Sequence, residues 1–123
     1  MLVFKLGVCE WGFPMPEPYA VKTAEEYGFS GLELDFGAYE KAYPLSVPAV
    51  QRAYLEMADD YGIEFPSMTI DSLNWYGLTQ PLDSRNGMIA FDGIRRGITI
   101  VSENTLSARR WTIWPGWWQG ASP

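Results

Sequence analysis

Histidine is absent from this chain of 123 residues, and cysteine occurs once, at Cys9. Without histidine, the chain alone cannot assemble a serine or cysteine triad with an imidazole base, nor a metal site with an imidazole ligand. The single cysteine excludes an intramolecular disulfide and a thiolate metal cluster. Cys9 is expected to be a small buried residue, because no basic neighbour is present to lower the pKa of its thiol. A reducing compartment, the cytoplasm, is the expected location.

Long apolar runs and excess positive charge are also missing. No segment approaches the length of a membrane span. The apolar start is interrupted by Lys5 and leads into Glu10, so we expect neither a secretory signal nor a lipoprotein cleavage site there. Nine Lys and Arg residues stand against fifteen Asp and Glu residues, and the net charge of −6 would repel nucleic-acid phosphates. Neither a membrane nor a nucleic acid is therefore an expected partner.

Apolar residues make up 47% of the chain, which is enough for one ordinary domain. They concentrate in three short runs that predict buried strands over residues 3–10, 30–36 and 65–70. A loop rich in glycine, proline or polar residues follows each run. The pattern predicts strands that alternate with another kind of element.

That element is an amphipathic helix after each predicted strand. Proline near the start of the first two helices suits the first helical turn, Gly28 and Gly62 suit their ends, and Ser46 is the expected N-cap of the second. Three sets of residues recur at helical spacing, and each is expected to form a buried face. The sets are Ala20, Thr23, Ala24 and Tyr27; Val50, Ala53, Tyr54, Met57, Ala58 and Tyr61; and Ala90, Gly93, Ile94, Gly97, Ile98 and Val101.

A repeat with a spacing of 34 residues links the first two strand and helix pairs. Ala-Glu-Glu-Tyr-Gly-Phe at residues 24–29 returns as Ala-Asp-Asp-Tyr-Gly-Ile at residues 58–63, and a predicted strand follows each copy. This spacing is close to that of one βα unit in a barrel or a doubly wound sheet. The predicted fold class is α/β: a partial (β/α)8 TIM barrel of about three βα units, since a complete barrel needs about 250 residues.

Residues 104–123 differ in character from residues 1–103, which we expect to form the barrel portion. The segment holds four of the six tryptophans, no acidic residue and no clear period, although a fourth strand is expected near its start. One hypothesis is a frameshift or truncation, because TGG, the only tryptophan codon, becomes frequent when a GG-rich gene is read one base off. The alternative is an authentic tail whose aromatic side chains cover an exposed sheet edge.

Acidic and hydroxyl side chains gather on one face of the predicted sheet. Because side chains alternate along a strand, Glu33 and Asp35 share the face opposite Leu32 and Leu34, and the third strand repeats the pattern. Such groups accept hydrogen bonds from sugar hydroxyls, and an aromatic wall suits the ring carbons. The alternative is that the acids are helix caps or solvated loop residues. The residues predicted to bind substrate are Glu10, Trp11, Glu33, Asp35, Thr69 and Asp71, with Trp11 the inward residue at the end of the first strand.

Three further features carry weaker signals. The acid pairs at residues 25–26 and 59–60 are expected on solvated helix surface. Arg95 and Arg96 could bind a phosphate, but adjacent residues on a helix point apart. The long loop over residues 74–87 contains aromatic residues, and loops after strands hold the binding surfaces of such folds.

Five segments occur in an order and at a spacing that resemble one known family. They are Lys-Leu-Gly-Val-Cys-Glu-Trp at residues 5–11, Tyr-Gly-Phe-Ser-Gly-Leu-Glu-Leu at 27–34, Tyr-Pro-Leu at 43–45, Tyr-Leu at 54–55 and Tyr-Gly-Ile-Glu-Phe-Pro-Ser at 61–67. Together they resemble the N-terminal portion of the sugar phosphate isomerase/epimerase group of the xylose isomerase-like TIM barrels. The resemblance covers about residues 2–103.

The resemblance implies a full-length parent that interconverts aldoses, ketoses or epimers by metal-assisted proton or hydride transfer. It also implies Mn²⁺, Mg²⁺ or Zn²⁺ bound by residues of later strands, so no metal is expected in this chain and no catalytic residue is assigned. This chain would supply the wall that contacts a sugar or sugar phosphate. Many relatives have a histidine at the end of the third strand, where this sequence reads Ser-Met-Thr-Ile-Asp at residues 67–71.

Two alternatives remain open. The chain could be a non-catalytic half-barrel fragment, inactive alone, that forms a homo-oligomer or binds a partner chain through an exposed sheet edge. A relative of the apurinic endonucleases would share the barrel, but the acidic charge and the missing ligands disfavour it.

Overall fold

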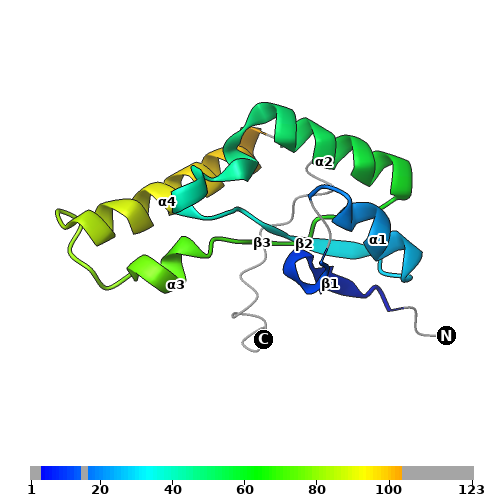
Figure 1. The fold of residues 1–123 in the computed structure, drawn as a ribbon, viewed down its shortest axis with the longest axis horizontal. Helices are drawn as coiled ribbons and strands as arrows, with labels where there is room; N and C mark the ends of the chain where they lie inside the picture. The colour runs from blue at the N-terminus through cyan, green and yellow to red at the C-terminus, as the bar shows by residue number, and fades with distance from the viewer. Residues whose placement is uncertain (1–3, 15–16, 104–123) are drawn as a thin grey trace, which may run out of the picture.

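The computed structural model describes residues 4–14 and 17–103, which form a mixed α/β architecture (Figure 1). The predicted atypical tail, residues 104–123, lies outside the described residues. The frameshift or truncation hypothesis and the alternative of an authentic tail therefore stay predictions. The elements, with η marking a 3-10 helix, are β1 (Gly7–Cys9), η1 (Glu10–Gly12), α1 (Ala20–Glu26), β2 (Gly31–Asp35), η2 (Tyr39–Lys41), η3 (Pro44–Ser46), α2 (Pro48–Tyr61), β3 (Met68–Thr69), α3 (Ser72–Tyr76) and α4 (Arg85–Glu103).

The strands form a parallel sheet in the order β1-β2-β3, so neighbours in the sheet are neighbours in the chain. Gly7 of β1 lies opposite Gly31 of β2, and Asp35 of β2 lies opposite Thr69 of β3. A helix makes each crossover, α1 before β2 and α2 before β3. The predicted α/β class with parallel strands is confirmed. Closure into a TIM barrel stays a prediction.

The repeat of 34 residues corresponds to two helix ends of the same geometry. Gly28 and Gly62 have φ angles of +83° and +67°, the left-handed conformation that glycine adopts most readily. In each copy the amide after the glycine donates to the alanine carbonyl five residues earlier, at 2.9 Å and 3.1 Å. The chain then joins the sheet, because the amide of Ser30 donates to the carbonyl of Leu6 and the amide of Glu64 donates to that of Ser30.

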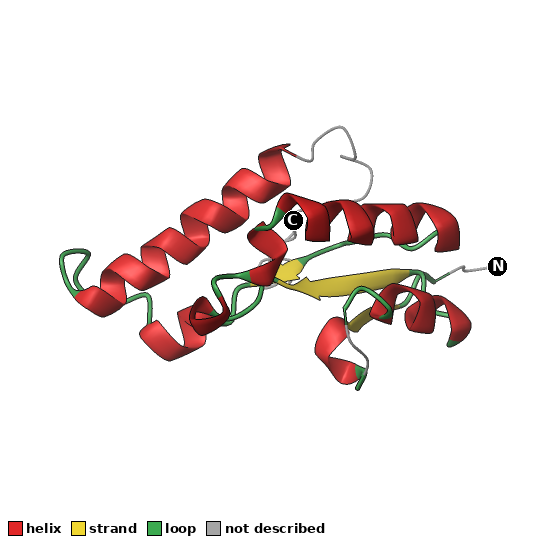
Figure 2. Cartoon of the chain, turned by 45° about the horizontal axis from the view of Figure 1, so that its top comes forward, coloured by secondary structure: helices red, strands yellow, loops and turns green. Residues whose placement is uncertain are grey.

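The apolar face of β2 forms the centre of the core. Leu32, Leu34 and Phe36 are fully buried, in one cluster with Tyr54 and Ala58 of α2. Figures 1 and 2 show α2 running along this side of the sheet. Burial of each such side chain contributes about 2 kcal/mol. The predicted alternation on β2 is therefore confirmed, with its aliphatic face against the helices.

Glycines allow α4 to approach the end of the sheet closely. A Cβ atom on Gly93 would lie 2.9 Å from Ser72 Oγ and 3.0 Å from the Tyr43 hydroxyl. A Cβ atom on Gly97 would lie 2.7 Å from Ile70 Cδ1. Both glycines are buried, as predicted for this face of the helix. The absence of their side chains makes room for the neighbouring elements.

Several local predictions are wrong. Ser46 does not cap α2, because Val47 occupies the N-cap position and Ser46 belongs to η3. Tyr27 is 73% exposed, since α1 ends one residue before it, and Ile98 is 58% exposed on the outer side of α4. The loop predicted over residues 74–87 contains the end of α3 and the start of α4.

Candidate functional site

Glu33 lies at the centre of the polar face of the sheet. Three hydrogen-bond donors from the neighbouring strand segments surround its carboxylate. Thr69 Oγ1 donates to Glu33 Oε1 at 3.1 Å, Cys9 Sγ approaches the same oxygen at 3.6 Å, and Ser67 Oγ donates to Oε2. Burial raises the pKa of the Cys9 thiol, and the negative charge of Glu33 raises it further. The structure thus brings the predicted residues Glu33 and Thr69 together, half-buried on the face opposite the helices.

Glu10 occupies a second, separate acidic position on the helix side of the sheet. Its side chain is only 5% exposed. Oε2 accepts a hydrogen bond from the Asp35 amide at 2.8 Å, and Oε1 accepts one from the hydroxyl of Tyr54 on α2. Burial disfavours the charged form and raises the pKa of Glu10 to about 7, although both hydrogen bonds act in the opposite direction.

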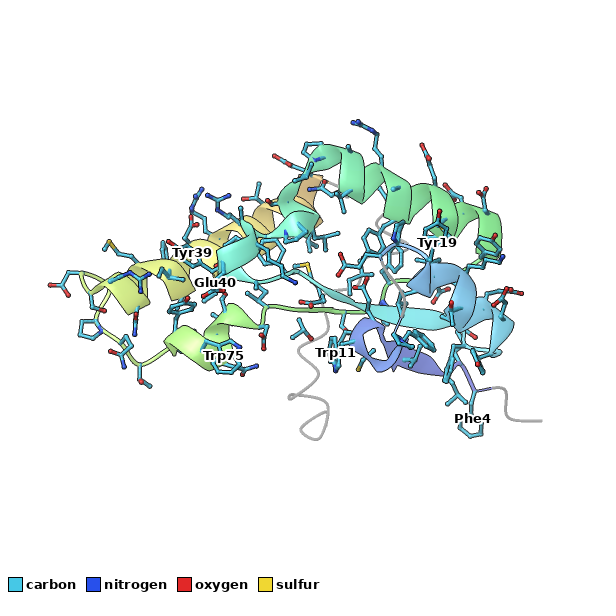
Figure 3. The ribbon with its side chains drawn as sticks, viewed as in Figure 1. Phe4, Trp11, Tyr19, Tyr39, Glu40 and Trp75 are labelled. Atoms are coloured by element: carbon cyan, nitrogen blue, oxygen red, sulfur yellow. The ribbon has the colours of Figure 1, made fainter. Side chains whose placement is uncertain are left out.

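The other residues at the ends of β1 and β2 face different surroundings. Asp35 Oδ1 accepts a hydrogen bond from the Gly37 amide at 2.9 Å, so this carboxylate holds the turn that follows β2. Trp11 lies in η1 and is 54% exposed, because β1 ends at Cys9 and the strand alternation stops there. Figure 3 shows Trp11 beside β1, apart from the labelled aromatic group formed by Tyr39 and Trp75.

A hollow of about 370 Å³ opens where the chain leaves β2 and β3. Its lining comes from residues 38–40 after β2 and residues 71–76 after β3. We call it the acidic aromatic hollow, because two carboxylates and three aromatic rings dominate it. These side chains are Tyr39, Glu40, Asp71, Trp75 and Tyr76, and Ala38 and Ser72 complete the lining.

Hydrogen bonds tie the acids of the acidic aromatic hollow to its aromatic rings. Asp71 Oδ2 accepts a hydrogen bond from Trp75 Nε1 at 2.8 Å. The Tyr76 hydroxyl donates to Glu40 Oε1, which lowers the pKa of Glu40 and raises that of Tyr76. Tyr39 packs edge-on against Tyr76, with ring centroids 5.6 Å apart. Contacts of Tyr76 on α3 with Tyr39 and Glu40 on η2 therefore join the two sides of the hollow, and Trp75 remains 77% exposed beside it.

A second hollow, of about 410 Å³, shares Tyr39 and Glu40 with the first and extends toward α4. Its other polar residues are Asp92 and Arg96, and Arg96 lies over the Tyr43 ring at 5.9 Å from the centroid. The turn at Tyr39 and Glu40 thus separates two adjacent depressions on one surface.

The structure brings some of the predicted site residues together and separates others. Only Asp71 of the six lines the acidic aromatic hollow, while Glu33 and Thr69 form the sheet-face cluster. The sequence draws attention to the segment that holds Trp75 and Tyr76, which the structure places in α3, but not to Glu40. No motif marks Glu40, and only its position a few residues after a predicted strand could have drawn attention to it.

Within residues 4–14 and 17–103, no group of three Cys, Asp or Glu side chains is arranged to hold a metal ion. No helix among these residues is both long enough and apolar enough to cross a membrane. No family model, no curated protein and no solved structure matches this chain.

Proposed function

We propose that this chain forms the substrate-side wall of a sugar isomerase or epimerase of the xylose isomerase-like barrel kind, with the sugar held in the acidic aromatic hollow. The observation that carries this proposal is the position of the hollow. It opens at the carboxyl ends of β2 and β3, the edge at which parallel α/β folds and barrels bind their ligands.

The chemistry of the lining supports a polyhydroxylated ligand. The carboxylates of Glu40 and Asp71 can accept hydrogen bonds from sugar hydroxyls, and the Trp75 indole offers an apolar surface to the carbon-bound hydrogens of a ring. The volume of about 370 Å³ lies within the range of small-molecule sites. Tyr39 and Tyr76 form an aromatic wall, because their rings pack edge-on against each other.

We assign binding and not turnover to this chain. In the proposed full-length enzyme, residues of later strands would hold a divalent metal, Mn²⁺, Mg²⁺ or Zn²⁺. This metal would assist the proton or hydride transfer. The described residues do not fit such a metal site. The acid oxygens of Glu10 and Glu33 instead accept hydrogen bonds from neighbouring side chains and from a backbone amide.

The binding proposal can be tested by nuclear magnetic resonance on the purified chain. The indole N–H of Trp75 is a direct probe, because it donates to Asp71 inside the hollow. We expect millimolar D-fructose or D-xylose to shift this resonance with saturation. Because Trp75→Ala removes the probe, binding to this variant is measured by calorimetry, and we expect it to be about tenfold weaker. Tyr19→Ala, an exposed aromatic residue at the opposite end of the described chain in Figure 3, is the matched control and should bind normally. A Trp75 resonance that no sugar moves would refute the proposal.

A second candidate, a non-catalytic half-barrel that self-associates, is favoured by one specific observation. Phe4 and Leu6, which precede β1 at the edge of the sheet, are 76% and 62% exposed. Sedimentation and calorimetry with D-fructose or D-xylose separate the candidates. Oligomers that bind no sugar support the fragment, whereas saturable sugar binding by monomers would overturn it.

A further inference from the structure

We infer that the acidic aromatic hollow takes an uncharged sugar without a phosphate group. This inference rests on the proposed function and specifies the substrate class of the same site. It follows from the distribution of charge around the hollow.

The charged side chains that line the hollow are both acidic. Glu40 lies on the β2 side and Asp71 on the β3 side, and no lysine or arginine is among the lining residues. The hydrogen bond from Tyr76 holds the pKa of Glu40 below its usual range, so Glu40 carries its charge at neutral pH. A ligand in the hollow therefore meets negative charge from two sides.

The two arginines that the sequence offers for a phosphate both contact one acid, and neither lines the acidic aromatic hollow. Arg95 Nη2 and Arg96 Nε each lie 2.7 Å from an oxygen of Asp92, one turn earlier on α4. Burial opposes the charge of Asp92, but the hydrogen bonds from both arginines outweigh it and lower the pKa of Asp92. Arg85 lies near enough to Glu40 to lower its pKa slightly, so its charge acts on the same carboxylate.

A phosphate ester brings a charge of about −1.5 to −2 at neutral pH. Placed within a hollow of this size, that charge comes within several ångströms of both carboxylates, where like charges repel strongly when partly shielded from water. We expect a sugar phosphate to bind at least tenfold more weakly than the same sugar without phosphate. Hydroxyl groups carry no such cost, because they donate hydrogen bonds to the same carboxylates.

The test compares matched ligands on the full chain. The Trp75 indole resonance is titrated with D-fructose and with D-fructose 6-phosphate, at low and at high ionic strength. Removal of the negative charge in Glu40→Gln and in Asp71→Asn should reduce the difference in affinity between the two ligands several-fold. Glu56→Gln, on the exposed side of α2, removes an equal charge outside the hollow and should leave the difference unchanged.

Each outcome decides a different claim. The inference is supported if D-fructose 6-phosphate binds more weakly than D-fructose. The difference in affinity should also become smaller in Glu40→Gln, in Asp71→Asn and at high ionic strength. Phosphate binding that is equal or tighter, while both ligands move the Trp75 resonance, overturns the inference and leaves the proposed function intact. If neither ligand moves the resonance, the proposed function fails and the inference fails with it.

Discussion

Replacing Glu10 by glutamine removes the titration of a buried carboxyl group while keeping its shape and its hydrogen bonds. Glutamine can accept the Asp35 amide with its oxygen and donate to the Tyr54 hydroxyl with its nitrogen. Any change in the pH dependence of stability then comes from the lost carboxyl group.

The magnitude follows from the pKa of Glu10, which burial raises from 4.5 to about 7. The folded state therefore binds a proton more tightly than the unfolded state. Each pKa unit is worth about 1.4 kcal/mol, so the protonated form contributes about 3 kcal/mol to the free energy of unfolding. The sign is opposite to that of a salt-bridged acid: this contribution is complete below pH 4.5 and is lost as the pH rises through about 7.

Urea denaturation followed by circular dichroism, at about pH 5 and about pH 8.5, measures this contribution. Between these pH values, we expect the free energy of unfolding of the wild-type chain to fall by about 2–3 kcal/mol because of Glu10. In Glu10→Gln this contribution to the fall should be absent. Glu25→Gln, exposed on α1, removes the same charge outside the buried cluster and should keep the wild-type dependence. Parallel pH profiles for the wild type and Glu10→Gln, within about 0.5 kcal/mol, would refute the assignment.

Two further predictions concern the glycines of α4 and the acidic aromatic hollow. Gly87→Ala should destabilise the chain by several kcal/mol, on the order of other overpacked sites, because its methyl group would overlap the backbone carbonyl of Pro81. Gly97→Ala meets only the ends of flexible side chains and should change the free energy of unfolding by no more than about 1 kcal/mol, so equal losses in both variants by urea denaturation would contradict the packing of α4. Tyr76→Phe removes the hydrogen bond that lowers the pKa of Glu40, so a carboxyl titration by nuclear magnetic resonance should give a higher pKa in the variant, and an unchanged value would place Tyr76 elsewhere.

The fold could be predicted well wherever the signal is local. Gly28 and Gly62 end helices because glycine adopts left-handed φ angles without a steric penalty. A glycine after a helical pattern can be recognised in the sequence alone. The alternation on β2 follows from strand geometry alone. The prediction for Ser46 is wrong because Pro48, with its fixed φ angle, begins the helix and Val47 becomes the N-cap.

The candidate site could be predicted only in part. Glu33 and Thr69 meet because adjacent parallel strands carry residues of the same face side by side, as the alternation predicts. Trp11 and Glu40 could not be placed, since η1 and η2 lie outside the regular elements and obey no period. Barrel closure and sugar chemistry remain predictions.

The α/β alternation, the repeated helix ends and the polar face of the sheet can be predicted from the sequence alone, because each depends on neighbours a few residues apart. Which acid is buried, and which two acids line a hollow, follows from the three-dimensional packing. Burial raises the pKa of Glu10, which accepts a hydrogen bond from Tyr54, 44 residues away, and Glu40 accepts one from Tyr76, 36 residues away. Desolvation and charge proximity depend on distance in space, and the order of residues along the chain does not contain it.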